Sequence, residues 1–193
     1  SLDYDKTNQK YRPSEGYRTI FLQELPIISD GFEIVNSLET IKYYELPSDM
    51  IGKISFYGKS VNTLKDNKDT RISKRLYIPQ SRLRGFESGK VGPIENADYV
   101  GGNYITTVNF TTTLPQVFPS LEILDFSFFI DAANIWGVDY NENLSNSDIR
   151  SSLGLGVDLQ TPIGPMSFSF SEVISKSSTD TTESFRFNIG TSF

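Results

Sequence analysis

The chain has 193 residues and a formal net charge of −6, and it contains neither Cys nor His. This length allows one domain with a sizeable core, and an acidic chain without a basic stripe is a poor nucleic-acid binder. The missing Cys and His exclude a disulfide framework, thiolate or imidazole metal sites, and Ser-His-Asp or Cys-based catalysis. We therefore expect no metal, no cofactor and no enzymatic activity.

The first part of the chain predicts β-strands, because apolar and polar residues alternate and helical periodicity is scarce. Residues 2–7 fit the end of a first strand, and residues 10–16 form a turn with Pro13 and Gly16 as breakers. Further strands are predicted over residues 17–25, 32–46 and 50–61.

Residues 62–101 show no clean period and carry many charges, prolines and glycines. A stretch of this length without regular structure in a compact domain usually signals function or disorder. It is nevertheless too apolar for a solvated linker, so we expect it to pack against the rest of the chain through its apolar residues: Leu76, Tyr77, Ile78, Leu83, Phe86 and Val91.

Alternation returns after this loop and predicts strands over residues 102–114, 123–136 and 149–161, one from about residue 166, and a last one over 185–193. Most are near the roughly 9–11 residues with which a tilted strand crosses a bilayer. Short connections alternate with longer polar ones, as in outer-membrane barrels. The last strand has one apolar side, formed by Phe185, Phe187, Ile189 and Phe193, and one polar side, formed by Arg186, Asn188, Gly190 and Ser192.

Alternation alone does not say which side of a strand faces inward. Apolar faces turned inward would give a soluble sandwich or a lipocalin-type ligand-binding barrel. The small polar residues on the opposite faces favour a wet interior instead, because a soluble core needs large apolar side chains to reach native packing density. The mean hydropathy of −0.30 and the lack of an 18-residue apolar run are compatible with strands that alternate across a membrane.

Several motifs in one order resemble the BamA family of outer-membrane assembly factors. Residues 75–93, with Arg84-Gly85-Phe86 followed by Gly92-Pro93, resemble the family's sixth extracellular loop. The other matching stretches are the periplasmic turn at 11–18, the strand start at 101–103, the strand at 128–136, the turn at 161–166 and the closing strand at 187–193. The resemblance therefore extends over nearly the whole chain.

The resemblance implies an all-β fold, an antiparallel transmembrane β-barrel of which residues 1–193 form the C-terminal half, with about eight strands and loop 62–101 folded toward the lumen. The periplasmic N-terminal domains of the family are absent from this sequence. The implied function is that of the insertase that folds and inserts β-barrel proteins into the outer membrane of a Gram-negative cell. The implied partners are the lipid bilayer, unfolded outer-membrane proteins and, for the full-length parent, accessory assembly lipoproteins.

The resemblance also implies the site residues. Arg84 would meet an acidic group of the lumen wall, and alternation places Asp131 on the polar face; Gly85 would allow close approach of the backbone and Phe86 would fill space against the wall. A solvent-exposed Arg84, worth about 0–1 kcal/mol in a surface pair, is the alternative. The sequence departs from the family pattern at Thr111, where a Glu is frequent, and at Ala133, where Gly is usual. We therefore expect either a weaker anchor for the loop or compensation by Glu87 or Asp158.

The closing strand is the second implied site. Phe185, Phe187, Ile189, Gly190 and Phe193 would form one side of a weakly paired seam, whose free edge templates an incoming strand, and Gly190 would weaken pairing there. A two-partner secretion translocator or an autotransporter assembly factor of the same superfamily, a passive porin and the soluble lipocalin-like barrel are the alternatives.

Overall fold

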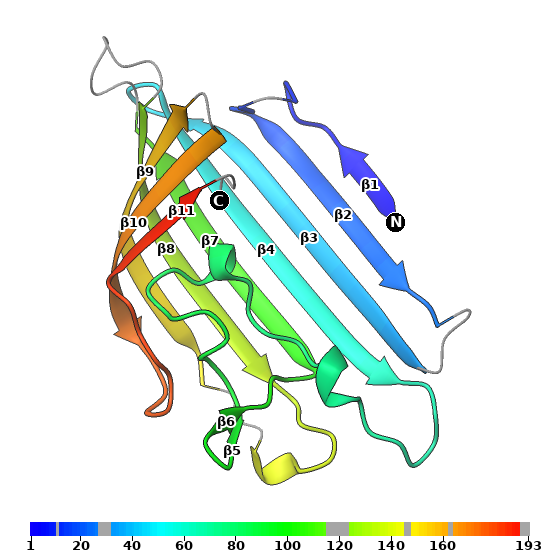
Figure 1. Ribbon diagram of the computed structural model, residues 1–193. Coiled ribbons are helices and arrows are strands. Elements are labelled where there is room, and N and C mark those ends of the chain that lie inside the picture. Colours follow the sequence, from blue (N-terminus) through cyan, green and yellow to red (C-terminus); the bar gives the residue numbers. More distant parts are fainter. Residues whose placement is uncertain (11, 27–31, 115–123, 145–147, 162–163, 190–193) are drawn as a thin grey trace.

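The computed structural model describes residues 1–10, 12–26, 32–114, 124–144, 148–161 and 164–189. Nine strands form one antiparallel sheet in the order β1-β2-β3-β4-β7-β8-β9-β10-β11 (Figure 1). None of the described residues belongs to a helix that is long and apolar enough to cross a membrane. The strands are β1 (Leu2–Asp5), β2 (Gly16–Glu24), β3 (Glu33–Leu46), β4 (Met50–Thr63), β7 (Tyr104–Thr113), β8 (Leu124–Trp136), β9 (Arg150–Thr161), β10 (Gly164–Ser175) and β11 (Phe185–Ile189).

The long loop between β4 and β7 spans residues 64–103 and contains more regular structure than the sequence predicted. It includes two 3-10 turns, η1 (Ile72–Lys74) and η2 (Gln80–Arg82), and a small hairpin of β5 (Ile94–Glu95) and β6 (Asp98–Tyr99). A third 3-10 turn, η3 (Glu142–Leu144), lies in the connection between β8 and β9. The expectation of forty residues without regular structure was therefore wrong in part.

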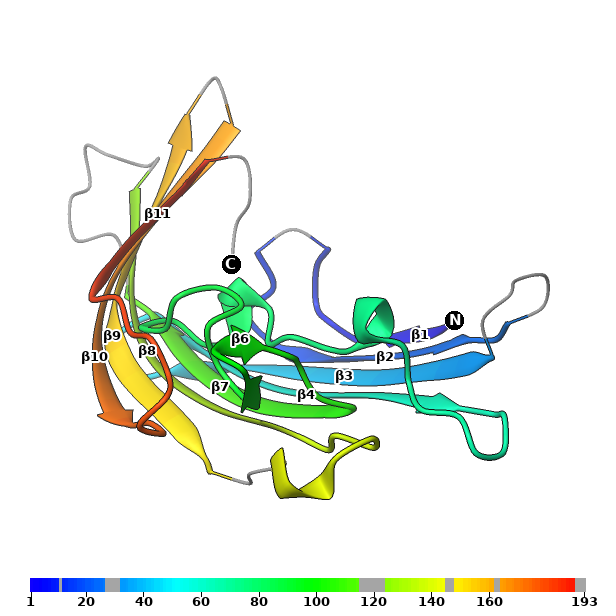
Figure 2. The same cartoon turned by 60° about the horizontal axis from the view of Figure 1, so that its bottom comes forward.

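The sheet is bent into a trough, and the long loop lies on its concave side (Figure 2). Each strand pairs with its sequence neighbours in the sheet, while β1 and β11 form the two edges and are not paired with each other in the described part of the chain. The expected antiparallel barrel half is confirmed, and the first strand, which was uncertain from the sequence, completes the nine.

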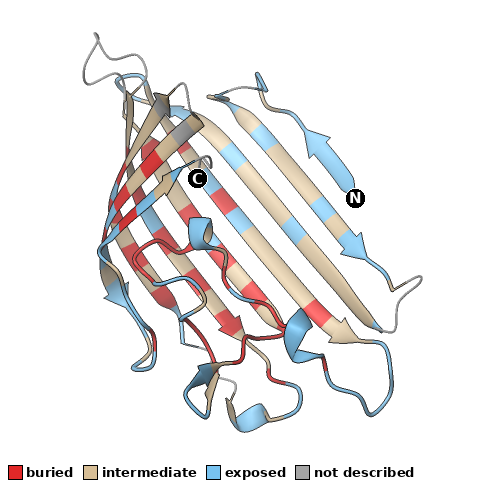
Figure 3. Cartoon of the chain, viewed as in Figure 1, coloured by how far each residue is buried: buried red, intermediate tan, exposed pale blue. Residues whose placement is uncertain are grey.

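Burial determines which face is which. On the concave face Asp131 and Ser152 are fully buried and Ser169 is 1% exposed, whereas on the convex face Leu155 is 57% and Phe170 is 53% exposed. Figure 3 shows buried residues collected in the loop and in the strands beneath it. The apolar stripes therefore face outward, as a transmembrane barrel requires, and a soluble lipocalin-type barrel is excluded.

The apolar core of the chain lies between the long loop and the concave face. The loop packs against the wall as expected, except that Tyr77 is 39% exposed, so its assignment to the packed set was wrong. The core cluster is formed by Val61, Leu76, Ile78, Leu83, Phe86, Val91, Ile105, Ala133 and Ile135.

Candidate functional site

The centre of the site is a buried ion pair between the loop and the sheet. Arg84, in the long loop, donates from Nε to Oδ2 of Asp131 and from Nη2 to Oδ1, each at 2.7 Å, so that the two planar groups pair fork to fork. The backbone N–H of Arg84 also donates to Oδ2 at 3.1 Å. The Arg84 side chain is 7% exposed and that of Asp131 is fully buried, which excludes a solvated Arg84.

Neighbouring groups complete the environment of this pair. Asn109 lies directly opposite Asp131 across the β7–β8 pairing and donates from Nδ2 to Oδ1 at 2.8 Å. The guanidinium of Arg84 lies 3.5 Å from the ring centre of Phe129, and the hydroxyl of Ser152 donates to the carbonyl of Arg84. Taken together, the two residues of the pair contact side chains on three adjacent strands, β7, β8 and β9.

The carboxylates proposed to compensate for Thr111 do not take that part. Glu87 donates its backbone N–H to the Thr181 carbonyl, and Asp158 accepts a hydrogen bond from the Ser167 hydroxyl. That expectation was wrong, because Asn109 supplies the additional contact as a neutral amide donor to Asp131. Asparagine meets the remaining acceptor capacity of the carboxylate without adding a second charge to a buried site.

Gly85 adopts a backbone conformation that favours glycine. Its φ is +90°, and a Cβ placed there would lie 3.1 Å from Cβ of Ser171 and 3.2 Å from Cβ of Ser152. The loop therefore approaches β9 and β10 so closely that a side chain at this position would crowd both serines. Phe86 follows and is 2% exposed within the apolar core, so the tripeptide supplies a charge, a turn and an apolar contact in succession.

A second ionic contact fixes the loop further along the trough. Arg82 donates from Nη2 to Oε1 of Glu39 on β3 at 2.8 Å, and its guanidinium lies 3.9 Å from the ring centre of Tyr57 on β4. Beyond this contact the concave face lines a cavity of about 650 Å³. Its lining is largely polar or charged and includes Lys53, Thr111, Asp125 and Asp158.

A third cluster ties the start of the loop to the connection that follows β8. Arg75 is fully buried in its side chain and pairs with Oδ1 of Asp139, while Asn103 donates to Oδ2 at 3.0 Å and Thr70 donates its backbone N–H there at 2.7 Å. Burial alone would raise the pKa of the Asp139 carboxyl, but these hydrogen bonds outweigh burial and lower the pKa to about 2.

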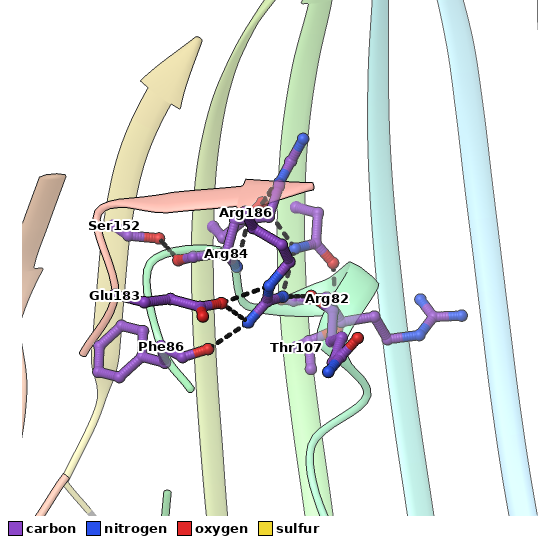
Figure 4. Close-up of polar contacts among 10 residues, drawn as sticks. Arg82, Arg84, Phe86, Thr107, Ser152, Glu183 and Arg186 are labelled. Carbon is purple, nitrogen blue, oxygen red and sulfur yellow. Dashed lines mark hydrogen bonds and ion pairs between the residues drawn. The ribbon is translucent and has the colours of Figure 1, made fainter. Parts of the chain in front are cut away.

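Two further arginines form buried polar contacts, and the sequence analysis did not identify them as site residues. Arg150 on β9 and Asp180, in the connection between β10 and β11, form an ion pair in which both side chains are fully buried. Arg186 on β11 reaches the loop directly (Figure 4), where it donates to the Gln80 carbonyl at 2.8 Å and to the Phe86 carbonyl. The sequence did contain a signal for Arg186, because alternation places it on the inward side of the last strand, where a buried arginine needs a partner.

The closing strand is placed as its alternation predicted. Phe185 and Phe187 are 50% and 41% exposed on the convex face, Ile189 is 56% exposed, and Arg186 faces inward and is 7% exposed. Phe187 stacks on Phe168 of β10 with ring centres 4.8 Å apart. Gly190 and Phe193, which belong to the predicted closing-strand signal, lie outside the described residues.

The charged side chains of the site hold the loop against the rest of the chain. In the described part of the chain, no group of three or more acidic, His or Cys side chains is placed to hold a metal ion. The ion pairs that join the loop to the rest of the chain include Arg82–Glu39 and Arg84–Asp131, which reach strands, and Arg75–Asp139, which reaches the connection after β8.

Comparisons with known proteins agree with this fold. The Omp85 superfamily domain matches residues 1–193. The chain is 28% identical over 139 residues to the outer membrane protein assembly factor BamA of Neisseria meningitidis serogroup B, covering 58% of this chain and 17% of that protein. It is 25% identical over 198 residues to BamA of Neorickettsia risticii, covering 100% of this chain and 27% of that protein.

A solved structure shares the fold. The crystal structure of BamA from Haemophilus ducreyi lacking POTRA domains 1-3 superposes with a TM-score of 0.84 at 24% identity, covering 96% of this chain and 40% of that one. The chain thus spans less than a third of the length of the two sequence relatives. Its fold is that of part of the BamA β-barrel, and the chain belongs to the Omp85 superfamily of outer-membrane proteins.

Proposed function

We propose that the chain is part of an outer-membrane insertase that folds β-barrel proteins and inserts them into the membrane. The observation that carries the proposal is the loop held on the concave face by Arg84 and Asp131, inside a sheet whose apolar side faces outward. The two sequence relatives, both called outer membrane protein assembly factors, support the same reading.

The structure offers a physical route to this activity that needs no covalent step. In the described part of the chain, β11 pairs on one side with β10 and is a sheet edge on the other. The backbone groups of such an edge can pair with an incoming strand, and burial of the new strand in lipid then drives the reaction forward. The protein would therefore act without being an enzyme, in keeping with a sequence that contains no His and no Cys.

The partners follow from this proposal. Lipid would contact the convex face, where Leu155, Phe170 and Phe187 are exposed. Unfolded outer-membrane proteins would be the substrates, and accessory assembly lipoproteins would bind the full-length parent. The proposal of accessory lipoproteins is based on the family resemblance alone.

The test uses the full-length parent reconstituted in lipid vesicles with a denatured porin as substrate. Deletion of Arg84-Gly85-Phe86, and separately Asp131→Asn, is expected to reduce the fraction of porin that reaches its folded, heat-modifiable form. Asp158→Asn is the matched control, since this carboxylate lines the same face but contacts Ser167 on β10 instead of the loop. Unchanged porin assembly by the deletion variant would contradict the role given to the loop.

A secretion translocator of the same superfamily would use a similar scaffold to export a chain through the membrane. The same vesicles separate the two functions, because an inserted substrate stays with the lipid whereas an exported one appears in the opposite aqueous compartment.

A further inference from the structure

The last strand of the chain has few contacts of its own. β11 pairs with β10 over five residue pairs, from Met166–Ile189 to Phe170–Phe185, and its apolar side chains are exposed on the convex face. On the convex face Phe185 and Phe187 contact aromatic rings of β10, so contacts of β11 with the long loop come from its concave side. On that side Arg186 is 7% exposed although it stands on an edge strand.

Arg186 uses its whole guanidinium on the long loop and on the residues that precede β11. Nη1 donates to the Gln80 carbonyl at 2.8 Å, Nη2 donates to the Phe86 carbonyl, and Nε pairs with the Glu183 carboxylate (Figure 4). Gln80 and Phe86 lie on either side of Arg84-Gly85. One side chain thus bridges the backbone before and after the segment that binds Asp131.

Both loop acceptors are backbone carbonyls, so the contact depends on the shape of the loop and not on the side chains at these positions. The two carbonyls lie within reach of one planar fork only when the segment takes the turn that Gly85 allows. When the loop leaves the concave face, Arg186 loses both carbonyl acceptors and keeps only the Glu183 carboxylate as a partner.

The chain leading into β11 contacts the same loop segment. Glu183 donates its backbone N–H to the Gly85 carbonyl at 3.0 Å, and Glu87 donates to the Thr181 carbonyl at 3.0 Å. An isolated antiparallel bridge joins Phe86 and Thr182 between these two bonds. Residues 181–183 therefore run alongside residues 85–87 as a short extra strand pair, directly upstream of Arg186.

We propose that Arg186 is a positioning residue that couples the pairing of β11 to the binding of the loop by Asp131. In this arrangement a bound loop holds β11 against β10, and a released loop frees β11. Asp131 is on β8 and Arg186 is on β11, and both bind the loop. The loop therefore links them directly, in addition to the pairing of the strands between them. The inference concerns contacts within this chain and does not depend on which substrate the protein handles.

The experiment measures hydrogen–deuterium exchange by mass spectrometry on the full-length parent in lipid nanodiscs. Arg186→Gln is expected to speed exchange roughly tenfold or more both at residues 185–189 and at residues 80–90, because three hydrogen bonds to a charged group are lost. Arg186→Lys is expected to restore part of the protection, since an ammonium reaches one carbonyl at a time. Arg18→Gln is the matched control, an inward arginine on β2 that pairs with Asp3.

The reciprocal variant makes the test decisive, because a coupling between two sites works in both directions. Asp131→Asn must also speed exchange at residues 185–189, and the double variant Asp131→Asn/Arg186→Gln must fall clearly short of the product of the two single effects. The proposal is overturned if Asp131→Asn leaves residues 185–189 at the wild-type rate, or if Arg186→Gln changes β11 but not the loop. Should Arg186→Gln fail to fold, Asp131→Asn alone still decides.

Discussion

Removing the charge of Asp131 is the sharpest perturbation that the structure suggests. Asp131 is fully buried and accepts three hydrogen bonds from Arg84 and one from Asn109. Asp131→Asn keeps the size of the side chain but replaces one acceptor oxygen with an NH₂ group that faces the guanidinium donors. The Arg84 side chain, 7% exposed, is then left as an uncompensated buried charge.

Breaking a buried ion pair from one side costs about 3–5 kcal/mol. At about 1.4 kcal/mol per tenfold change, the population of molecules with a released loop rises roughly 10²- to 10⁴-fold. The effect should be local, because the strands that carry Asp131 and its neighbours retain their pairing across the sheet.

Limited trypsin digestion of the full-length parent in micelles reports this population. Arg84 is 6% exposed, so cleavage after it requires the loop to leave the concave face. When opening and closing are fast relative to cleavage, the initial rate follows the open population. We expect Asp131→Asn to be cleaved far faster than wild type and Asp158→Asn to match wild type. Equal cleavage of the two variants would refute the assignment of Asp131 as the main anchor of the loop.

Three other predictions concern the loop and the outer face. Gly85→Ala should cost about 1–3 kcal/mol of loop stability, because its φ is +90° and the new methyl group would crowd two serine side chains; the thermal midpoint in micelles measures this. The folded-state pKa of Asp139 is lowered from 3.8 to about 2, so its stabilising contribution is complete above about pH 4 and is lost as the pH falls through about 2; Asp139→Asn should remove this acid sensitivity from the protease resistance of the loop. Leu155→Arg, at a convex position that is 57% exposed, should destabilise the protein in vesicles by about 2–4 kcal/mol if it lies at the bilayer midplane, whereas Thr111→Arg, which faces the cavity, should change the urea midpoint much less.

The strands themselves were predictable because a half-exposed strand has a two-residue period, and every main strand of the sheet falls close to its predicted range. Alternation alone did not give the orientation of their faces, since it is the same whether the apolar side faces lipid or a core; the small polar residues on the opposite side indicated it. The packing of the loop decides it in the structure. The loop contacts join residues that are distant in the sequence and meet only in the folded sheet, as Leu76 meets Gly102 and Phe86 meets Arg186.

Some of the residues that anchor the loop could likewise be predicted from the sequence, and others could not. Arg84 and Asp131 were identified through the resemblance of their motifs, and alternation placed Asp131 on the inward face. Asn109 was missed because its contact depends on the register between β7 and β8, and register is not readable from either strand alone. Arg150 and Asp180 were missed because they are 30 positions apart, one at the start of a strand and the other in a connection. No local sequence pattern links two such positions.

The position of the apolar core also bears on how the protein behaves outside a bilayer. In a barrel with a water-filled interior, nearly all apolar contacts are made with lipid tails, so extraction by detergent replaces nearly all of them. Here the nine residues of the core cluster, such as Val61 on the sheet and Phe86 on the loop, are buried between the loop and the concave face, away from the outer surface. Changing the amphiphile or the membrane thickness should therefore alter the outer surface while leaving this interior unit folded.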